Sequence, residues 1–267
     1  FVFSNFGSDP KTFNFFTAGE TSSTDVTDRL VSSLVRRNQF TLEYEPDLAE
    51  SWTVSADQLT ITYKLRKGLK WSDGTPITAG DWAYAREIAF LEGIEGSNAD
   101  GYYVGDVPAE VIAVDDMTVQ FVFPEIYAGA FGMAGAPVPT HIYKPVIDAG
   151  GVEAFNAFHG VDTDVTKVVS SGPFVVNEYI PSQKVVMGRN PYYYEKDAKG
   201  VQLPYIDEFI IIYVEDQDTE LEKFLAGELD MLIMRGEDYG VLVGEKEALD
   251  MSIYSVGPST STNFLTF

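Results

Sequence analysis

Short stretches in which apolar and polar residues alternate run along most of the chain, and this period of two predicts β-strands. The clearest stretch is 59–65, where every second residue is apolar. The polar residues 55–58 separate it from the alternation around Trp52, so the two stretches are predicted to form a hairpin. An apolar run at 209–214 is expected for a central strand covered on both faces. The predicted strands are 1–6, 52–54, 59–65, 117–123, 174–179, 184–187, 209–214 and 229–233.

Apolar residues spaced by four predict a helix near the start of the chain. Val26, Leu30 and Leu34 have this spacing and follow Thr24-Asp25, either of which can cap a helix. Arg36-Arg37 would fall in the last turn, where cations suit the helix dipole. The sequence therefore predicts one helix that extends to about residue 37.

Further helices are indicated by their boundary signals. Thr78 followed three residues later by Asp81 resembles a capping box. The predicted helices are the one after Thr78, 139–149 before Gly150-Gly151, and 219–226 between Asp218 and Gly227. The glycine-rich stretch 93–105 is predicted to be a loop. The strand–helix–strand order of 209–233 indicates a right-handed crossover in a mixed or parallel sheet.

The composition narrows the classes of protein that this α/β pattern can represent. The 267 residues, 45% of them hydrophobic, suit one large domain or two ordinary ones. A formal net charge of −23 opposes binding to nucleic acid and to anionic lipid. The absence of cysteine excludes disulfides, thiolate catalysis and cysteine-based metal sites. No apolar run reaches about 18 residues, so we expect no membrane-spanning helix.

Several strings, in a fixed order, resemble the signature of family 5 extracellular solute-binding proteins, the oligopeptide and dipeptide receptors of ABC importers. The strings are 45–52, 59–65, 66–76, 171–174, 189–194, 203–208 and 226–230. The departures are small: Ser171 stands where the family usually has threonine, Tyr194 where it has tryptophan, and Gln58 where it has glycine. The matches cover most of the chain.

The resemblance implies an α/β fold, a lobe like that of type II periplasmic binding proteins, with a smaller α+β domain inserted into a mixed-sheet domain. It places the sheet domain at 1–44 and 168–258, the inserted domain at 45–167, and the start of a crossover at 259–267. A strand like 251–256 would precede the crossover. We therefore expect the chain to be the first lobe of a receptor about twice as long, with the second lobe missing.

The implied function is capture of an extracellular solute between two lobes and its delivery to the transmembrane subunits of an ABC permease. A peptide is the expected ligand, since most named members of the family bind peptides. An oligosaccharide is the alternative, because 199–205 resembles members associated with sugars as well as peptides. The resemblance implies no cofactor, and a location outside the cell or in the periplasm, with a lipid anchor ahead of residue 1 as an option.

Candidate ligand contacts are loop residues that the resemblance and their position at strand ends single out. Cleft ligands are usually held by aromatic faces and a few fixed polar groups. The candidates are Asn5, Phe6 and Ser8 after the first strand, Tyr102 and Tyr103 in the glycine-rich loop, Met234 and Arg235 after 229–233, and Ser259, Ser261 and Asn263 in the crossover. Packing of loops is the competing interpretation for each.

The sequence contains no motif for catalysis or for a metal site. His141 and His159 are the only histidines, and neither has partners at metal-ligand or triad spacing, so we interpret both as structural or surface residues. We expect a protein that is not an enzyme. An extracellular carbohydrate-active enzyme, which needs two carboxylates facing one cleft, and a structural interaction domain are the alternatives from other classes.

Overall fold

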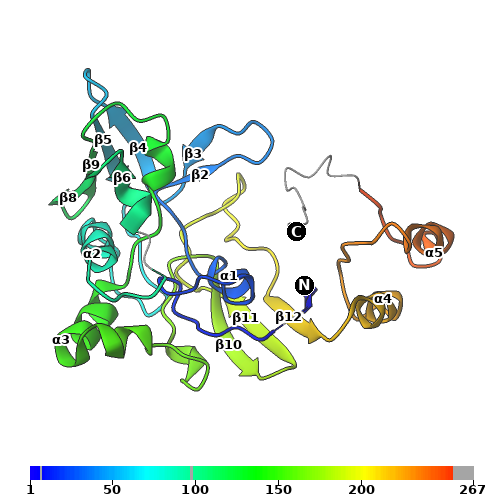
Figure 1. Cartoon of the computed structure of the whole chain (residues 1–267). Coiled ribbons are helices and arrows are strands. Elements are labelled where there is room, and N and C mark those ends of the chain that lie inside the picture. Colours follow the sequence, from blue (N-terminus) through cyan, green and yellow to red (C-terminus); the bar gives the residue numbers. More distant parts are fainter. Residues whose placement is uncertain (7, 97–98, 255–267) are drawn as a thin grey trace, which may run out of the picture.

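The computed structural model describes residues 1–6, 8–96 and 99–254, and contains two separate four-stranded sheets (Figure 1). The first sheet joins the start of the chain to its second half, through β1 (Val2–Phe6), β10 (Phe174–Ile180), β11 (Lys184–Arg189) and β12 (Glu208–Val214). The second is built from one continuous part of the chain, through β4 (Ala49–Val54), β5 (Thr60–Leu65), β8 (Glu110–Asp115) and β9 (Thr118–Val122). The exact boundaries proposed for the domains stay a prediction.

The first sheet is mixed, as the sequence predicted. Its strands stand in the order β1-β12-β11-β10, with β1 and β12 parallel and the other pairs antiparallel. β12 is the predicted central strand, and Ile211 is buried, but its neighbours Ile210 and Ile212 are only half-buried. The face of β12 that carries Ile210 and Ile212 is therefore less covered than predicted.

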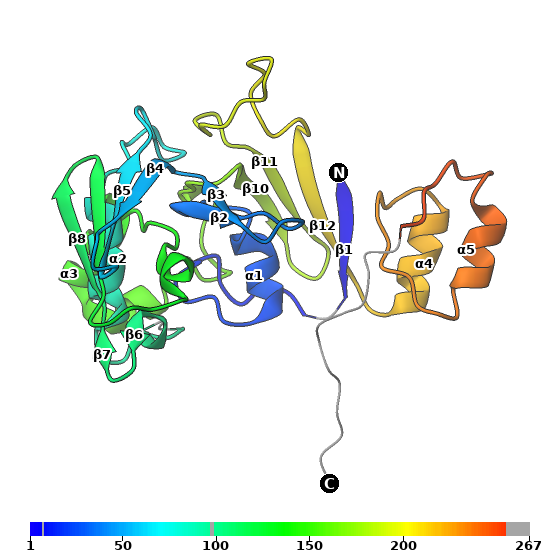
Figure 2. The same ribbon diagram turned by 90° about the horizontal axis from the view of Figure 1, so that it is seen from above.

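Helices lie on the two faces of this sheet. Val26 of α1 (Thr21–Thr27) packs with Ile211 and Met187 in one buried cluster. On the opposite face, the hydroxyl of Ser4 in β1 donates to the Glu220 carboxylate of α4 (Gln217–Leu225). Figure 2 shows β1 between these two helices.

The second sheet is antiparallel throughout, in the order β4-β5-β9-β8. The predicted hairpin is confirmed, and Gln58 in its turn has a positive φ of 60°. The buried side chains of Tyr63, Phe121 and Trp71 form its core together with Trp82 of α2 (Gly80–Ala89). Alternation therefore predicted β4, β5, β9 and the buried face, but it missed β8.

The remaining elements are short apart from one helix. They are the strand pairs β2 (Val35–Arg37) with β3 (Tyr44–Pro46) and β6 (Tyr103–Val104) with β7 (Val107–Pro108), the 3-10 helices Ala99–Tyr102, Ala130–Met133 and Val165–Lys167, and the helices α3 (Thr140–Asn156) and α5 (Tyr239–Glu245). The stretch 93–105, predicted as a loop, thus contains a 3-10 helix and β6. None of the helices in the described ranges is long and apolar enough to cross a bilayer.

The first predicted helix was wrong in extent. α1 begins after Glu20 and ends at Thr27, and residues 35–37 form β2 instead. Leu30 and Leu34 are buried, but in two different clusters. The spacing of four thus predicted correctly that these residues are buried, but its prediction of one continuous helix was wrong.

Two other helices differ from prediction at their ends. α3 continues past the predicted stop to Asn156, because Gly151, with a φ of 66°, forms a kink between two helical segments. α4 is capped by Asp216 and not by Asp218, since the Asp216 carboxylate accepts from the backbone N–H of Thr219 at 2.7 Å. At the start of α2, the Asp81 carboxylate accepts from Thr78 N at 3.0 Å, but no side chain caps the helix.

The strand predicted at 229–233 was wrong, because no strand is formed there. A single backbone bond, from Asp230 N to Val2 O at 2.9 Å, links this segment to β1. Residues 251–254 are not a strand either, and the rest of the stretch predicted at 251–256 lies outside the described residues.

Candidate ligand-binding face

The carboxyl ends of β1 and β12 bring two of the predicted contact regions to one edge of the first sheet. In the parallel register Phe6 pairs with Val214, and the capping Asp216 follows two residues later. In sheets of this kind ligands bind beyond the carboxyl ends of the strands. This edge is therefore the candidate ligand-binding face.

The candidates at the end of the first strand lie at this edge, and one of them, Asn5, already has a hydrogen-bond partner. Asn5 donates from Nδ2 to Asp25 Oδ2 of α1 at 2.7 Å, and it is half-buried. Ser8 is exposed, whereas Phe6 is described only as part of the β1 backbone. A ligand could reach Ser8 directly, whereas Asn5 would first have to loosen its bond to Asp25.

Arg235 reaches the same edge and is held there by carboxylates. Its guanidinium lies 2.8 Å from Asp218 of α4, 3.1 Å from Glu237 and 2.8 Å from Asp238. Hydrogen bonding to Asp238 and Asp218 raises the pKa of Arg235, and the Arg235 guanidinium lowers the pKa of Asp238. Met234 beside it is half-buried. The ion pairs of Arg235 therefore hold its loop against the start of α4.

The tyrosines predicted from the glycine-rich loop lie elsewhere. Both pack on Phe90 at the end of α2, with ring centroids 6.1 Å away for Tyr102 and 5.8 Å for Tyr103. Burial raises the pKa of Tyr102 to about 12. Figures 1 and 2 both place β6 and α4 at opposite ends of the molecule. Ser259, Ser261 and Asn263 lie outside the described residues, and a binding role for every candidate stays a prediction.

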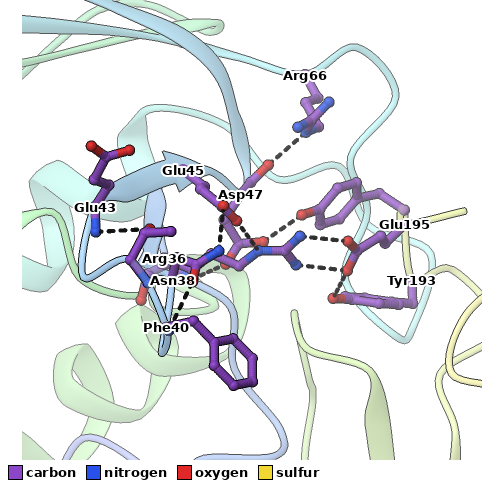
Figure 3. A network of polar contacts seen from close by, with 12 residues as sticks. Arg36, Asn38, Phe40, Glu43, Glu45, Asp47, Arg66, Tyr193 and Glu195 are labelled. Carbon is purple, nitrogen blue, oxygen red and sulfur yellow. Dashed lines mark hydrogen bonds and ion pairs between the residues drawn. The ribbon is translucent and has the colours of Figure 1, made fainter. Parts of the chain in front are cut away.

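A polar network that the sequence reasoning missed joins the β2–β3 ribbon to the segment after β11 (Figure 3). Arg36 in β2 forms a two-pronged pair with Glu195, at 3.0 Å and 2.8 Å, and Tyr193 donates its hydroxyl to the same carboxylate at 2.9 Å. Bidentate pairs of this kind are both strong and directional. The hydrogen bond from Arg36 is the main reason that the pKa of Glu195 is lowered.

Asp47 is the buried centre of this network. Its carboxylate accepts from the hydroxyl of Tyr194 and from Ser33 N at 3.2 Å, while its backbone carbonyl accepts from Arg66 Nε at 2.5 Å. Burial raises the pKa of Asp47, and the hydrogen bond from Tyr194 opposes that rise. Asp47 and Tyr194 each lie in one of the family-like strings, 45–52 and 189–194. A contact across more than 140 residues, however, leaves no signal in a single sequence.

The network supports a hairpin with an exposed aromatic tip. Phe40 is 97% exposed, and the Asn38 side-chain carbonyl shapes the turn by accepting from Phe40 N at 2.9 Å and Thr41 N at 3.0 Å. A rigidly based aromatic tip is a surface that can bind a partner group. No sequence feature had marked Phe40.

The histidines do not form a metal site. His141 Nε2 lies 2.7 Å from Asp73 Oδ2 on the surface, while His159 is buried. Over the part of the chain that the structure describes, no three His, Cys, Asp or Glu residues are grouped so that they could hold a metal ion.

Comparison with known proteins decides the family. Residues 43–267 match the bacterial extracellular solute-binding proteins, family 5, middle region. The chain belongs to this family. The family resemblance derived from the sequence strings is confirmed.

Two curated relatives carry names that describe binding proteins. A probable ABC transporter-binding protein of Deinococcus radiodurans is 36% identical over 227 residues, which are 83% of this chain and 38% of the relative. The oligopeptide-binding protein AliB of Streptococcus pneumoniae is 32% identical over 245 residues, 83% of this chain and 35% of the relative. The chain thus spans little more than a third of the length of these relatives.

A solved structure confirms the type of fold. The periplasmic binding protein MelB of Agrobacterium fabrum, in complex with stachyose, superposes with a TM-score of 0.76 at 25% identity, over 91% of this chain and 39% of that chain. The α/β lobe like that of periplasmic binding proteins is therefore confirmed, and the matched part is again less than half of the relative.

Proposed function

We propose that this family 5 chain is the ligand-capturing part of an ABC-importer receptor whose ligand is a peptide. The observation that carries the proposal is the family match over residues 43–267, together with the 32% identity to an oligopeptide-binding protein. In this proposal the ligand is held between this chain and a second lobe, and it favours the closed state by its higher affinity for that state. The transmembrane subunits of the permease are the proposed partners.

The domain boundaries proposed above belong to the same picture. A sheet domain at 1–44 and 168–258 would carry the β1 and β12 edge, and the inserted domain at 45–167 would carry the second sheet. The Tyr194–Asp47 bond would then join the inserted domain to the sheet domain, whereas the Arg36–Glu195 pair would lie within the sheet domain. We propose an extracellular or periplasmic location and binding without catalysis.

Native mass spectrometry of the full-length receptor purified from its host tests the ligand class. The expected result is a bound mass that fragments into amino-acid residues. A bound mass that fragments into hexose units would replace the peptide with a sugar. Turnover of glycosides, abolished by one Asp or Glu substitution, would overturn the receptor proposal itself.

An oligosaccharide is the second candidate ligand, and one observation favours it. The solved relative described above, at a TM-score of 0.76, is named as a complex with stachyose. Calorimetry of the full-length receptor with stachyose and with a mixed tetrapeptide library separates the two. Tight binding of stachyose, with no binding of the peptides, would identify the ligand as a sugar.

A further inference from the structure

A cavity of about 780 Å³ lies between the segment 158–169 and strand β10. β10 is the edge strand farthest from β1 in the first sheet, so this cavity and the candidate ligand-binding face are on opposite edges. None of the predicted ligand contacts within the described ranges lines it. Its size is in the range of pockets that hold small molecules.

His159 lines this cavity with a buried ring and a left-handed backbone conformation. The residue is only 4% exposed, and no described residue makes a hydrogen bond to its ring. Its φ is 58°, a left-handed conformation that costs energy in a residue other than glycine. The conformation is fixed because its carbonyl accepts from Phe13 N at 2.8 Å. Burial lowers the pKa of His159 to about 4, so the ring is neutral at pH 7.

A neutral imidazole offers one donor and one acceptor nitrogen. The cost of burying such a group is recovered only when it is hydrogen-bonded. The ring lies against that of Phe158, with centroids 3.9 Å apart and the ring planes tilted by 40°, and this contact restricts its orientation. His159 is therefore a preorganised polar group at the wall of a cavity.

The other polar groups of the cavity are complementary to an uncharged acceptor. Lys167 and Asn177 line it, and the side chain of neither makes a hydrogen bond or close ion pair with any described residue. The two carboxylates on its wall are already engaged: Asp73 accepts from Thr75 N at 2.9 Å and contacts His141, and Asp164 accepts from Thr166 N at 3.1 Å. Free donors favour a ligand oxygen, while the two carboxylates outnumber the one cation, Lys167, so the charge of the wall disfavours an anion.

The rest of the wall is apolar. It is formed by side chains from α3, β10 and the connecting segment, namely Ile142, Phe158, Val168, Val169, Val175 and Val176. We propose that this cavity is a second binding site, for an uncharged amide with a compact apolar body, in which the imidazole of His159 hydrogen-bonds the amide group.

The two histidines make this proposal directly measurable. In a ¹H–¹³C spectrum of the 267-residue protein, His141 and His159 give two imidazole Cε1–H signals, and His141 serves as the internal control. The probe is N-acetyl-leucine methylamide. The expected result is a saturable shift of the His159 signal, with the His141 signal unmoved. Absence of a saturable shift, or equal movement of both signals, would overturn the proposal.

Two matched probes test the chemistry of the site. N-acetyl-leucine differs by one negative charge and should bind about fivefold more weakly because Asp73 and Asp164 repel it. N-acetylglycine methylamide lacks the apolar body and should bind about tenfold more weakly. If the free acid binds as tightly as the amide, the charge argument is refuted.

Variants at the exposed rim test the site without disturbing the core. Lys167→Gln replaces a charged ammonium donor by a shorter, neutral amide and should weaken binding of N-acetyl-leucine methylamide about threefold. Lys144→Gln is the matched control, because Lys144 pairs with Asp148 at 3.2 Å along α3, and it should leave the affinity unchanged. Equal effects of both substitutions would place the ligand outside this cavity and contradict the proposal.

Discussion

Replacing Tyr194 by phenylalanine removes one hydroxyl from a buried carboxylate and tests whether the network around Asp47 contributes to stability. Tyr194 donates to one oxygen of Asp47, and Ser33 N donates to the other at 3.2 Å. Asp47 is only 6% exposed, so water cannot fully replace the lost donor. A hydrogen bond to a charged group contributes about 1.5–3 kcal/mol, and we expect Tyr194→Phe to lower the free energy of unfolding by about 2 kcal/mol at pH 7.

The pH dependence of this loss follows from the pKa of Asp47. Burial raises that pKa above its ordinary value, and the Tyr194 hydroxyl opposes the rise. Without the hydroxyl the pKa of Asp47 in the folded state rises further. At a pH above the pKa of the variant the carboxylate is charged and the full loss is present. As the pH falls through the pKa of the variant, Asp47 takes up a proton, and the difference between variant and wild type becomes smaller.

Urea unfolding at pH 7 and pH 4.5 measures both effects. The matched control is Tyr192→Phe, since the Tyr192 hydroxyl makes no hydrogen bond to any described residue. The Lys70 ammonium lies over its ring, 5.2 Å from the centroid, and this contact is kept in phenylalanine. The control should stay within about 0.5 kcal/mol of wild type. Equal losses in the two variants, or a loss in Tyr194→Phe that grows on acidification, would refute the reasoning.

Three further substitutions have definite expectations, each measured by urea unfolding. Gly172→Ala should cost at least about 2 kcal/mol, because the added Cβ would lie 2.6 Å from the backbone nitrogen of Val31. Asp81→Ala should cost about 2–3 kcal/mol and alter tryptophan fluorescence, because the buried Nε1 of Trp71 loses its acceptor at 3.3 Å. Phe40→Ser should change stability by less than about 0.5 kcal/mol, because that ring is 97% exposed.

The parts of the fold that were predictable from the sequence are those in which local pattern and tertiary contact agree. In the β4–β5 hairpin, alternation placed Ile61, Tyr63 and Leu65 on one face, and all three are buried in the second sheet. The register could be inferred because a shift by one residue would expose that whole face. The family strings added the order of the elements, which periodicity alone does not give.

The failed predictions are those in which tertiary partners override the local pattern. Residues 28–34 have helical spacing, but Ser171 N bonds Leu30 O at 3.0 Å and the Ser171 hydroxyl accepts from Ser32 N at 3.1 Å. These bonds to a turn about 140 residues away take the backbone groups that a helix would use. At 229–233 alternation is present, but Leu229 is buried while Ile233 is 71% exposed, so no face is covered that would fix a strand.

The position of the candidate site stays a prediction, and the contacts of its residues could not be predicted from the sequence, as Arg235 shows. The sequence marked it as a candidate ligand contact, with loop packing as the alternative, and three carboxylates surround it, at 2.8 Å to Asp218, 3.1 Å to Glu237 and 2.8 Å to Asp238. One positive and three negative charges leave this edge of the sheet negative. A ligand carboxylate can bind Arg235 only by displacing one of these groups, and the remaining two would still repel it. The edge as it stands therefore suits the cationic or neutral part of a peptide better than its carboxyl terminus.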